Sequence, residues 1–254
     1  MNQTSRTTLG RPSKLAEAKA ASPAVTVPHR AYVGPEERYD LVGAMQFRLL
    51  CALGLREHHK LLDLGCGSLR AGRLLIPYLA RGNYHGVEPN HWLVEQGIQQ
   101  EIGRDLVALK WPHFHCIDTF RVDEFGRNFD YILAQSIFSH TGVDLLRRAL
   151  ASFSRSLSPK GLGVVTFIHA ENVSGAVDDS NGWVYPGVVT YTPQRLQEEF
   201  HNCGLAGRPL PWHHPNHQTW YALAKHSGAL PDPGLDRHFG GAVWRVPECA
   251  DSLK

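Results

Sequence analysis

The sequence predicts an α/β protein built on a doubly wound, mostly parallel sheet. Short apolar segments with strand patterning alternate along the chain with segments of helical spacing. The first predicted strand leads at once into a tight glycine turn and a helix, and polar residues follow the ends of the later strands. This alternation is typical of parallel sheets with helices on both faces. The 254 residues are enough for one large domain with additional segments at its ends.

Composition limits the partners and the location that we expect. The formal charge is +2 at pH 7, so the chain is nearly balanced, and a nucleic-acid partner is not expected. The five cysteines are odd in number and scattered, which indicates reduced thiols and a cytoplasmic location. No apolar run approaches the about 20 residues that span a bilayer, and no membrane partner is expected.

Three regions are expected along the chain. Residues 1–30, rich in Ser, Thr, Ala, Lys and Pro, offer little to bury and are expected to form a flexible N-terminal arm. Residues 31–226 form the folded domain, which begins with a helix at 35–54 opened by a proline. Residues 227–254 form a C-terminal tail that wraps either the pocket or a second subunit, which leaves a homodimer open.

The pattern L-L-D-L-G-C-G-S-L-R at residues 61–70 organises the predicted site. Its leucines predict a short buried strand with Asp63 near the end. Gly65 and Gly67 then allow a turn tight enough to bring backbone N–H groups against a ligand before a helix begins. The pattern indicates nucleotide binding.

Arg70 occupies the third position of the dinucleotide pattern G-x-G-x-x-G. A pyrophosphate requires a small residue there, because the helix start must approach both the strand and the phosphates. An NAD-dependent dehydrogenase is therefore disfavoured. About twenty residues further on, the pattern Y-H-G-V-E predicts a second strand ending in Glu88, whose carboxylate is placed to accept hydrogen bonds from both hydroxyls of a ribose.

These two patterns resemble those of class I, Rossmann-like methyltransferases that depend on S-adenosylmethionine, most of all bacterial small-molecule methyltransferases. The resemblance spans residues 35–225 and is strongest from Leu61 to Asn90. It implies a seven-stranded sheet with a final antiparallel strand, a methyltransferase domain at 31–226, and S-adenosylmethionine as the cofactor. It also implies that the helix at 35–54 lies over the pocket as a lid.

The resemblance also implies a set of cofactor contacts. Arg70 is expected to hold the carboxylate of the cofactor or of an acidic substrate. Asp118, after a third strand at 113–117, is expected at the adenine, with an Asx cap as the alternative. The predicted cofactor-binding residues are Asp63, Gly65, Cys66, Gly67, Arg70, Glu88, Pro89, Asn90, Asp118 and Gln135.

His140 is the predicted catalytic residue. The fourth strand, at 129–134, leads into the segment Q-S-I-F-S-H at 135–140, which resembles the S-x-x-x-H segment after strand four of many small-molecule methyltransferases. A histidine there is suited to take a proton from an acceptor hydroxyl near neutral pH. The alternative is that His140 only ends a turn and helps to cap the next helix.

Two later segments are expected to shape the acceptor pocket. The long polar stretch at 169–191 follows the fifth strand and is interpreted as a lid loop. The last two strands, at 206–212 and 218–225, flank the loop H-H-P-N-H, whose histidines contact the acceptor or merely fill a polar loop. The predicted substrate-binding residues are Tyr185, His214 and His217. No metal site is predicted, because Pro215 prevents a regular helix and no Cys or Glu lies at ligand spacing.

The sequence therefore predicts methyl transfer from S-adenosylmethionine to a small-molecule acceptor. The expected acceptor atom is the oxygen of a hydroxyl or a carboxylate, in a natural product or sugar-pathway intermediate. Two alternatives stay open: methylation of a protein side chain or terminus, and a regulator that binds the cofactor without turnover.

Overall fold

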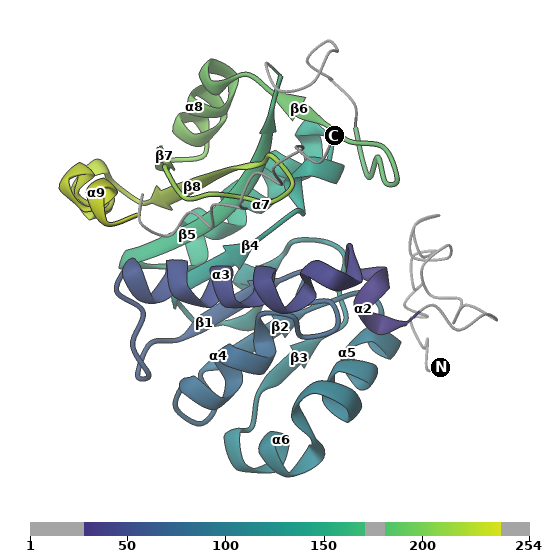
Figure 1. Ribbon diagram of the computed structural model, residues 1–254. Coiled ribbons are helices and arrows are strands. Elements are labelled where there is room, and N and C mark those ends of the chain that lie inside the picture. Colours follow the sequence, from purple (N-terminus) through teal and green to yellow (C-terminus); the bar gives the residue numbers. More distant parts are fainter. Residues whose placement is uncertain (1–27, 171–180, 240–254) are drawn as a thin grey trace, which may run out of the picture.

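A computed structural model describes residues 28–170 and 181–239, and its centre is one sheet (Figure 1). The strand order is β3-β2-β1-β4-β5-β8-β7, and the short β6 pairs with the end of β5. Only β8 runs antiparallel to its neighbours, which confirms the predicted doubly wound sheet with one antiparallel strand. The two-residue β6 adds an eighth strand to the seven expected. The strands are β1 (Leu61–Leu64), β2 (Tyr84–Val87), β3 (His113–His115), β4 (Phe129–Ala134), β5 (Leu157–His169), β6 (Thr190–Tyr191), β7 (Ala206–Leu210) and β8 (Thr219–Ala224).

Helices cover both faces of the sheet (Figure 1). Side chains of α3, α4 and α5 form one apolar cluster with one face, and side chains of α7 and α8 form another with the opposite face. None of the helices in the described ranges is long and apolar enough to cross a membrane. The α-helices are α2 (His29–Tyr32), α3 (Tyr39–Ala52), α4 (Gly72–Tyr78), α5 (His91–Gly97), α6 (Arg104–Lys110), α7 (Val143–Ser156), α8 (Pro193–Asn202) and α9 (Asp236–Phe239).

The central strands are apolar on both faces. In β4, Leu133 belongs to the cluster that includes α3 and α4, whereas its neighbours Ile132 and Ala134 belong to the cluster that includes α7. Successive side chains of a strand point to opposite faces, so a strand covered on both sides needs apolar residues at nearly every position. This requirement explains why β4 was recognisable from its sequence.

The ends of the domain differ from the expectation. Most of the predicted arm at 1–30 lies outside the described residues, but α2 begins at His29, inside its last positions. Residues 227–239, predicted as the start of a tail, pack on the domain: the ring of Phe239 contacts Trp212 at a centroid distance of 5.7 Å. Residues 240–254 of that predicted tail lie outside the described part of the chain.

Candidate active site

A cavity of about 430 Å³ lies at the carboxyl edge of the sheet. It is lined by Leu64 at the end of β1, Val87 at the end of β2 and Gln135 just after β4. The strand order reverses between β1 and β4, and open α/β sheets bind ligands at such a switch point. The volume is within the range of small-molecule sites.

The glycine turn forms one wall of this cavity. Gly65 and Gly67 have φ values of 76° and 54°. A Cβ atom at Gly65 would collide with the side chain of Ile137, and one at Gly67 would lie 2.7 Å from Cγ1 of Val33. The N–H groups of Gly65 and Cys66 do not point to a ligand as predicted, because both donate to the main-chain oxygen of the last β2 residue, at 2.8 and 3.0 Å. The glycines therefore serve close packing, and the turn is anchored to β2.

Asp63 and Cys66, predicted as cofactor contacts, lie behind the turn and are not among the residues that line the cavity. Asp63 is buried and accepts a 2.8 Å hydrogen bond from the hydroxyl of Tyr84. Burial raises the pKa of the Asp63 carboxyl to about 6. The Cys66 thiol packs against β2, 2.8 Å from where a Cβ of Gly86 would lie, and burial raises its pKa. Both side chains hold β1 and β2 together.

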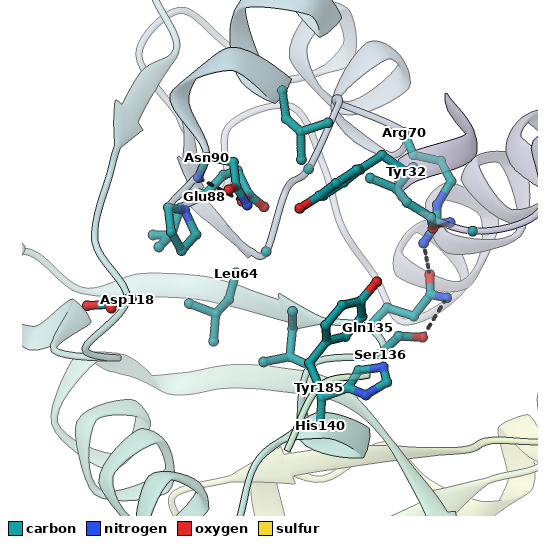
Figure 2. Close-up of a pocket in the computed structure, with 18 of the residues that line it drawn as sticks. Tyr32, Leu64, Arg70, Glu88, Asn90, Asp118, Gln135, Ser136, His140 and Tyr185 are labelled. Atoms are coloured by element: carbon teal, nitrogen blue, oxygen red, sulfur yellow. Dashed lines mark hydrogen bonds between the residues drawn. The ribbon is translucent and has the colours of Figure 1, made fainter. Parts of the chain in front are cut away.

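Glu88 and Asp118 provide carboxylates on one side of the cavity (Figure 2). Glu88 is 8% exposed, and its Oε1 accepts hydrogen bonds from the main-chain N–H of Asn90 at 2.9 Å and from Asn90 Nδ2 at 2.6 Å. The loop after β2 therefore fixes the carboxylate. The Oδ1 atom of Asn90 is buried without a hydrogen-bond partner among the described residues.

Arg70 lies on the other side of the cavity, beside Gln135 (Figure 2). It donates to the main-chain oxygen of Val33 at 2.8 Å and to Gln135 Oε1 at 3.3 Å. Burial lowers the pKa of Arg70, and its Nε atom has no hydrogen-bond partner in the described part of the chain. No carboxylate of the described residues forms an ion pair with this guanidinium. Arg70 is half-buried, and a cation that has lost part of its hydration is stabilised by an anion, so this side of the cavity suits an anionic group.

The amide of Gln135 faces two hydrogen-bond donors, Arg70 and His214, and can accept from only one of them. The Nδ1 atom of His214 accepts the main-chain N–H of Asn216 at 3.1 Å, so the ring proton lies on Nε2, which is 3.0 Å from the Gln135 amide. Arg70 also approaches this amide as a donor. One amide has one oxygen, and whichever way it is turned, either Arg70 or His214 lacks an acceptor. A carboxylate beside Arg70 would supply the missing one.

His140 lies at the end of a short helix, η4 (Phe138–His140), and lines the cavity. Its Nδ1 donates to the main-chain oxygen of Gly187 at 2.8 Å. This hydrogen bond makes Nε2 the nitrogen that can accept a proton. The ring of Tyr185 packs edge-on against that of His140, with centroids 5.3 Å apart.

The described part of the predicted lid loop wraps around η4. The N–H of Val184 donates to the main-chain oxygen of His140 at 2.9 Å, and the N–H of Gly142 donates to Gly182 at 2.7 Å. These bonds bring Trp183 and Tyr185 to the cavity. Residues 171–180 of the lid loop lie outside the described ranges.

Ser136 lines the cavity, and sequence analysis did not identify it as a site residue. Its φ is 58°, in the left-handed region, which is strained for a residue with a side chain and concentrates at functional sites. Its N–H donates to Thr166 Oγ1 at 2.8 Å, and its Oγ accepts from Gln218 Nε2 at 3.0 Å. Nothing in the local sequence marks this conformation.

The segment before α3 covers the cavity, not the predicted lid helix. None of residues 35–54 lines it, whereas Tyr32, Val33 and Gly34 do. Glu101 holds this segment, because Arg30 donates to its two carboxylate oxygens at 2.7 and 2.8 Å. No pattern in the sequence predicted α2, because it has only four residues.

Most of the predicted site residues lie together. His214 and His217 do not: they line a separate shallow hollow, and His214 is buried beneath Gln135. Burial and the nearby Arg70 lower the pKa of His214 to about 3, so its ring is neutral. The predicted residues that line the main cavity are Gly65, Gly67, Arg70, Glu88, Pro89, Asn90, Asp118, Gln135, His140 and Tyr185.

Comparisons with known proteins agree with this geometry. Residues 62–162 match the protein family described as "Methyltransferase domain". No curated protein matches the sequence. A solved structure of similar fold is that of DesVI from Streptomyces venezuelae, with a TM-score of 0.58 and 17% identity over 80% of this chain and 100% of that chain.

Two further structures are those of named methyltransferases. Magnesium protoporphyrin IX methyltransferase (ChlM) from Synechocystis PCC 6803, solved with bound S-adenosylmethionine, has a TM-score of 0.55 and 14% identity over 77% of this chain and 88% of its own. The CcbJ methyltransferase from Streptomyces caelestis has a TM-score of 0.55 and 13% identity over 83% and 95% of the two chains. These likenesses establish the fold.

The family match runs from β1 to β5 and so contains the glycine turn, Glu88 and His140. The sheet has the strand order, the switch point and the single antiparallel strand described above. The chain therefore has the fold of class I methyltransferases, and its residues 62–162 match a methyltransferase domain.

Proposed function

We propose that the protein transfers a methyl group from S-adenosylmethionine to an oxygen atom of a small molecule. The observation that carries the proposal is the polarity of the cavity. Carboxylates of Glu88 and Asp118 lie on one side, and the half-buried guanidinium of Arg70, with no carboxylate partner among the described residues, lies on the other. A ligand with ribose hydroxyls at one end and a carboxylate at the other complements this arrangement.

The residues present fit such a cofactor. Asn90 Oδ1 and Arg70 Nε, in residues that line the cavity, are both buried and have no hydrogen-bond partner within residues 28–170 and 181–239. In our proposal Glu88 accepts hydrogen bonds from the ribose, Asp118 recognises the adenine, and Arg70 binds the carboxylate. When bound, the cofactor supplies an electrophilic methyl group, and its sulfur keeps the electron pair of the broken carbon–sulfur bond.

His140 acts on the acceptor in this proposal. Its Nε2 takes the proton of the acceptor hydroxyl as the oxygen forms its bond to the methyl carbon. The Gly187 carbonyl holds the ring in the tautomer that this role needs. Trp183 and Tyr185 flank the acceptor and exclude water, which preserves the geometry of an in-line transfer.

We also infer a cytoplasmic location and no nucleic-acid partner. Cys51, Cys66, Cys116 and Cys203 are free thiols, as is usual for proteins of a reducing compartment. The nearly balanced charge of the chain supports the second inference.

Binding and transfer experiments test the function. Calorimetry should show binding of S-adenosylmethionine and S-adenosylhomocysteine and none of NAD. Incubation with cofactor carrying a radiolabelled methyl group and a fractionated bacterial metabolite extract should place label in a small-molecule fraction. The label should require His140, and a His140→Ala enzyme that still binds the cofactor is the control. Label recovered only on protein, or binding of NAD in preference, would contradict the proposal.

A further inference from the structure

We infer that the acceptor is an uncharged ring that carries more than one hydroxyl group. The inference rests on the proposed function, because it takes Arg70 to be occupied by the carboxylate of the cofactor. Three features of the cavity support it: its charges, its aromatic rings and one unpaired amide oxygen.

The charges disfavour an anionic acceptor. Arg70 is the only Lys or Arg side chain that lines the cavity within the described ranges. Arg38 lies near the rim, but its guanidinium donates to the main-chain oxygen of Pro215 and to Asn216 Oδ1, each at 3.1 Å, and it does not line the cavity. With Arg70 occupied, a carboxylate or phosphate of the acceptor would lose its hydration without gaining a cation. Such burial is strongly unfavourable.

Aromatic side chains from separate segments line the same cavity. Tyr32 comes from α2, Phe120 follows β3, and Trp183 and Tyr185 come from the loop around His140. Figure 2 shows Tyr32 and Tyr185 projecting into the cavity from different sides. Tyr185 is 46% exposed, so part of its ring is accessible to a ligand. Flat aromatic surfaces favour a ring as the group that lies between them.

The amide oxygen of Gln218 requires a hydrogen-bond donor. Gln218 lines the cavity, and its Nε2 donates to Ser136 Oγ at 3.0 Å, which fixes the orientation of the amide. Its Oε1 is buried and has no partner among the described residues. A buried unpaired acceptor is unfavourable, and a hydroxyl can donate to it whereas a carboxylate cannot. In the proposed function His140 takes the proton of the hydroxyl that is methylated, so the hydroxyl that donates to Gln218 is a second one.

The experiment compares neutral probes with their acidic counterparts. Calorimetry first establishes that S-adenosylhomocysteine binds, since failure there removes the proposed function itself. The loaded enzyme is then titrated with two pairs: catechol and 3,4-dihydroxybenzoate, and methyl glucoside and glucuronate. In at least one pair, the neutral member should bind about tenfold more tightly or better, because the acidic member must bury a charge that has no partner. The pair that responds distinguishes an aromatic ring from a sugar ring.

Two outcomes overturn the inference while leaving the proposed function intact. One is that the acid binds as tightly as its neutral partner in both pairs, which would indicate that Arg70 binds the acceptor and not the carboxylate of the cofactor. The other is that neither neutral probe binds while S-adenosylhomocysteine does.

Variants tie the selectivity to the named residues. Gln218→Leu should weaken the neutral probe about tenfold, and Gln218→Glu, which keeps an acceptor oxygen, should weaken it less. Tyr185→Ala should also weaken the probe. Trp111→Ala is the matched control, because Trp111 is an exposed aromatic residue, 59% accessible, that does not line the cavity. Unchanged probe affinity in both Gln218→Leu and Tyr185→Ala would contradict the inference.

Discussion

Arg70 donates a 2.8 Å hydrogen bond to the main-chain oxygen of Val33. The guanidinium therefore holds the segment that covers the cavity and also faces the ligand site. Val33 in turn packs on Gly67, so the cover, the guanidinium and the glycine turn form one structural unit.

Replacing Arg70 should weaken cofactor binding. Arg70→Met should lower the affinity for S-adenosylhomocysteine by about tenfold or more, because a charge-assisted hydrogen bond to a carboxylate contributes about 1.5–3 kcal/mol. Calorimetry measures the change. Arg73→Met is the control, since Arg73 pairs with Asp40 at 2.7 Å and does not line the cavity. Equal affinity in Arg70→Met and the wild type would refute the assignment.

Glu88→Ala should reduce cofactor affinity severely while the fold stays intact. The carboxylate is held in place by Asn90, so its removal takes away an acceptor that is already oriented toward the cavity. Calorimetry with S-adenosylhomocysteine and a thermal melt separate the two effects. Glu95→Ala, at an exposed ion pair with Arg104, should change neither. If the Glu88→Ala variant kept the wild-type affinity for S-adenosylhomocysteine, the assignment of Glu88 as the ribose contact would be wrong.

His140→Gln should slow methyl transfer about a hundredfold or more, the usual loss on removing a general base, with cofactor affinity unchanged. The methyl-transfer rate of the wild type should fall as the pH is lowered, because a protonated Nε2 cannot accept a proton. The rate of the variant should not show this fall at low pH. Single-turnover rates across pH measure both. A parallel loss of cofactor affinity would instead make His140 a binding or structural residue.

Stability should fall with pH below about 6.5 because of His85. Burial and the neighbouring His113 and Arg127 lower the pKa of this ring to about 3. The unfolded chain therefore binds a proton between about pH 6.5 and 3 that the folded chain does not, and the folded state loses at most about 1.4 kcal/mol per pH unit from this group.

Denaturant unfolding at pH 7.5 and pH 5 measures the effect. Asp63, whose pKa is raised to about 6, acts in the opposite direction, so the comparison is with a His85→Phe variant. The variant should show a smaller loss of stability on acidification than the wild type. An identical pH dependence in the two proteins would show that His85 does not contribute.

Chelation should leave the activity unchanged. In residues 28–170 and 181–239, no group of three or more His, Cys, Asp or Glu side chains is placed to hold a metal ion. Methyl transfer assayed with and without excess EDTA provides the measurement. An enzyme that loses activity with EDTA and recovers it with zinc would restore the loop at 213–217 as a ligand site.

Sequence analysis was most successful where the signal is local. The glycine turn and Glu88 directly follow short buried strands, and Asp118 lies just beyond the end of β3, so strand order alone brings them to one edge of the sheet. The strands themselves were recognisable because burial on both faces leaves nearly continuous apolar runs.

The parts that could not be predicted depend on contacts between distant segments. Val33 and Gln218 reach the cavity from opposite ends of the domain, and neither belongs to a segment with the hydrophobic spacing of a helix or a strand. His214 was expected at the acceptor because its loop is on the active edge, but the fold turns its side chain under Gln135. Spacing along the chain does not specify which side of a loop faces a pocket.

In the proposed mechanism, the carbonyl of Gly187, 47 positions further along the chain, selects the nitrogen of His140 that accepts the proton. The same stretch of backbone carries Trp183 and Tyr185 into the pocket. Remodelling this stretch to admit a different substrate would therefore disturb the base in the same step, so substrate range and basicity cannot be engineered separately here.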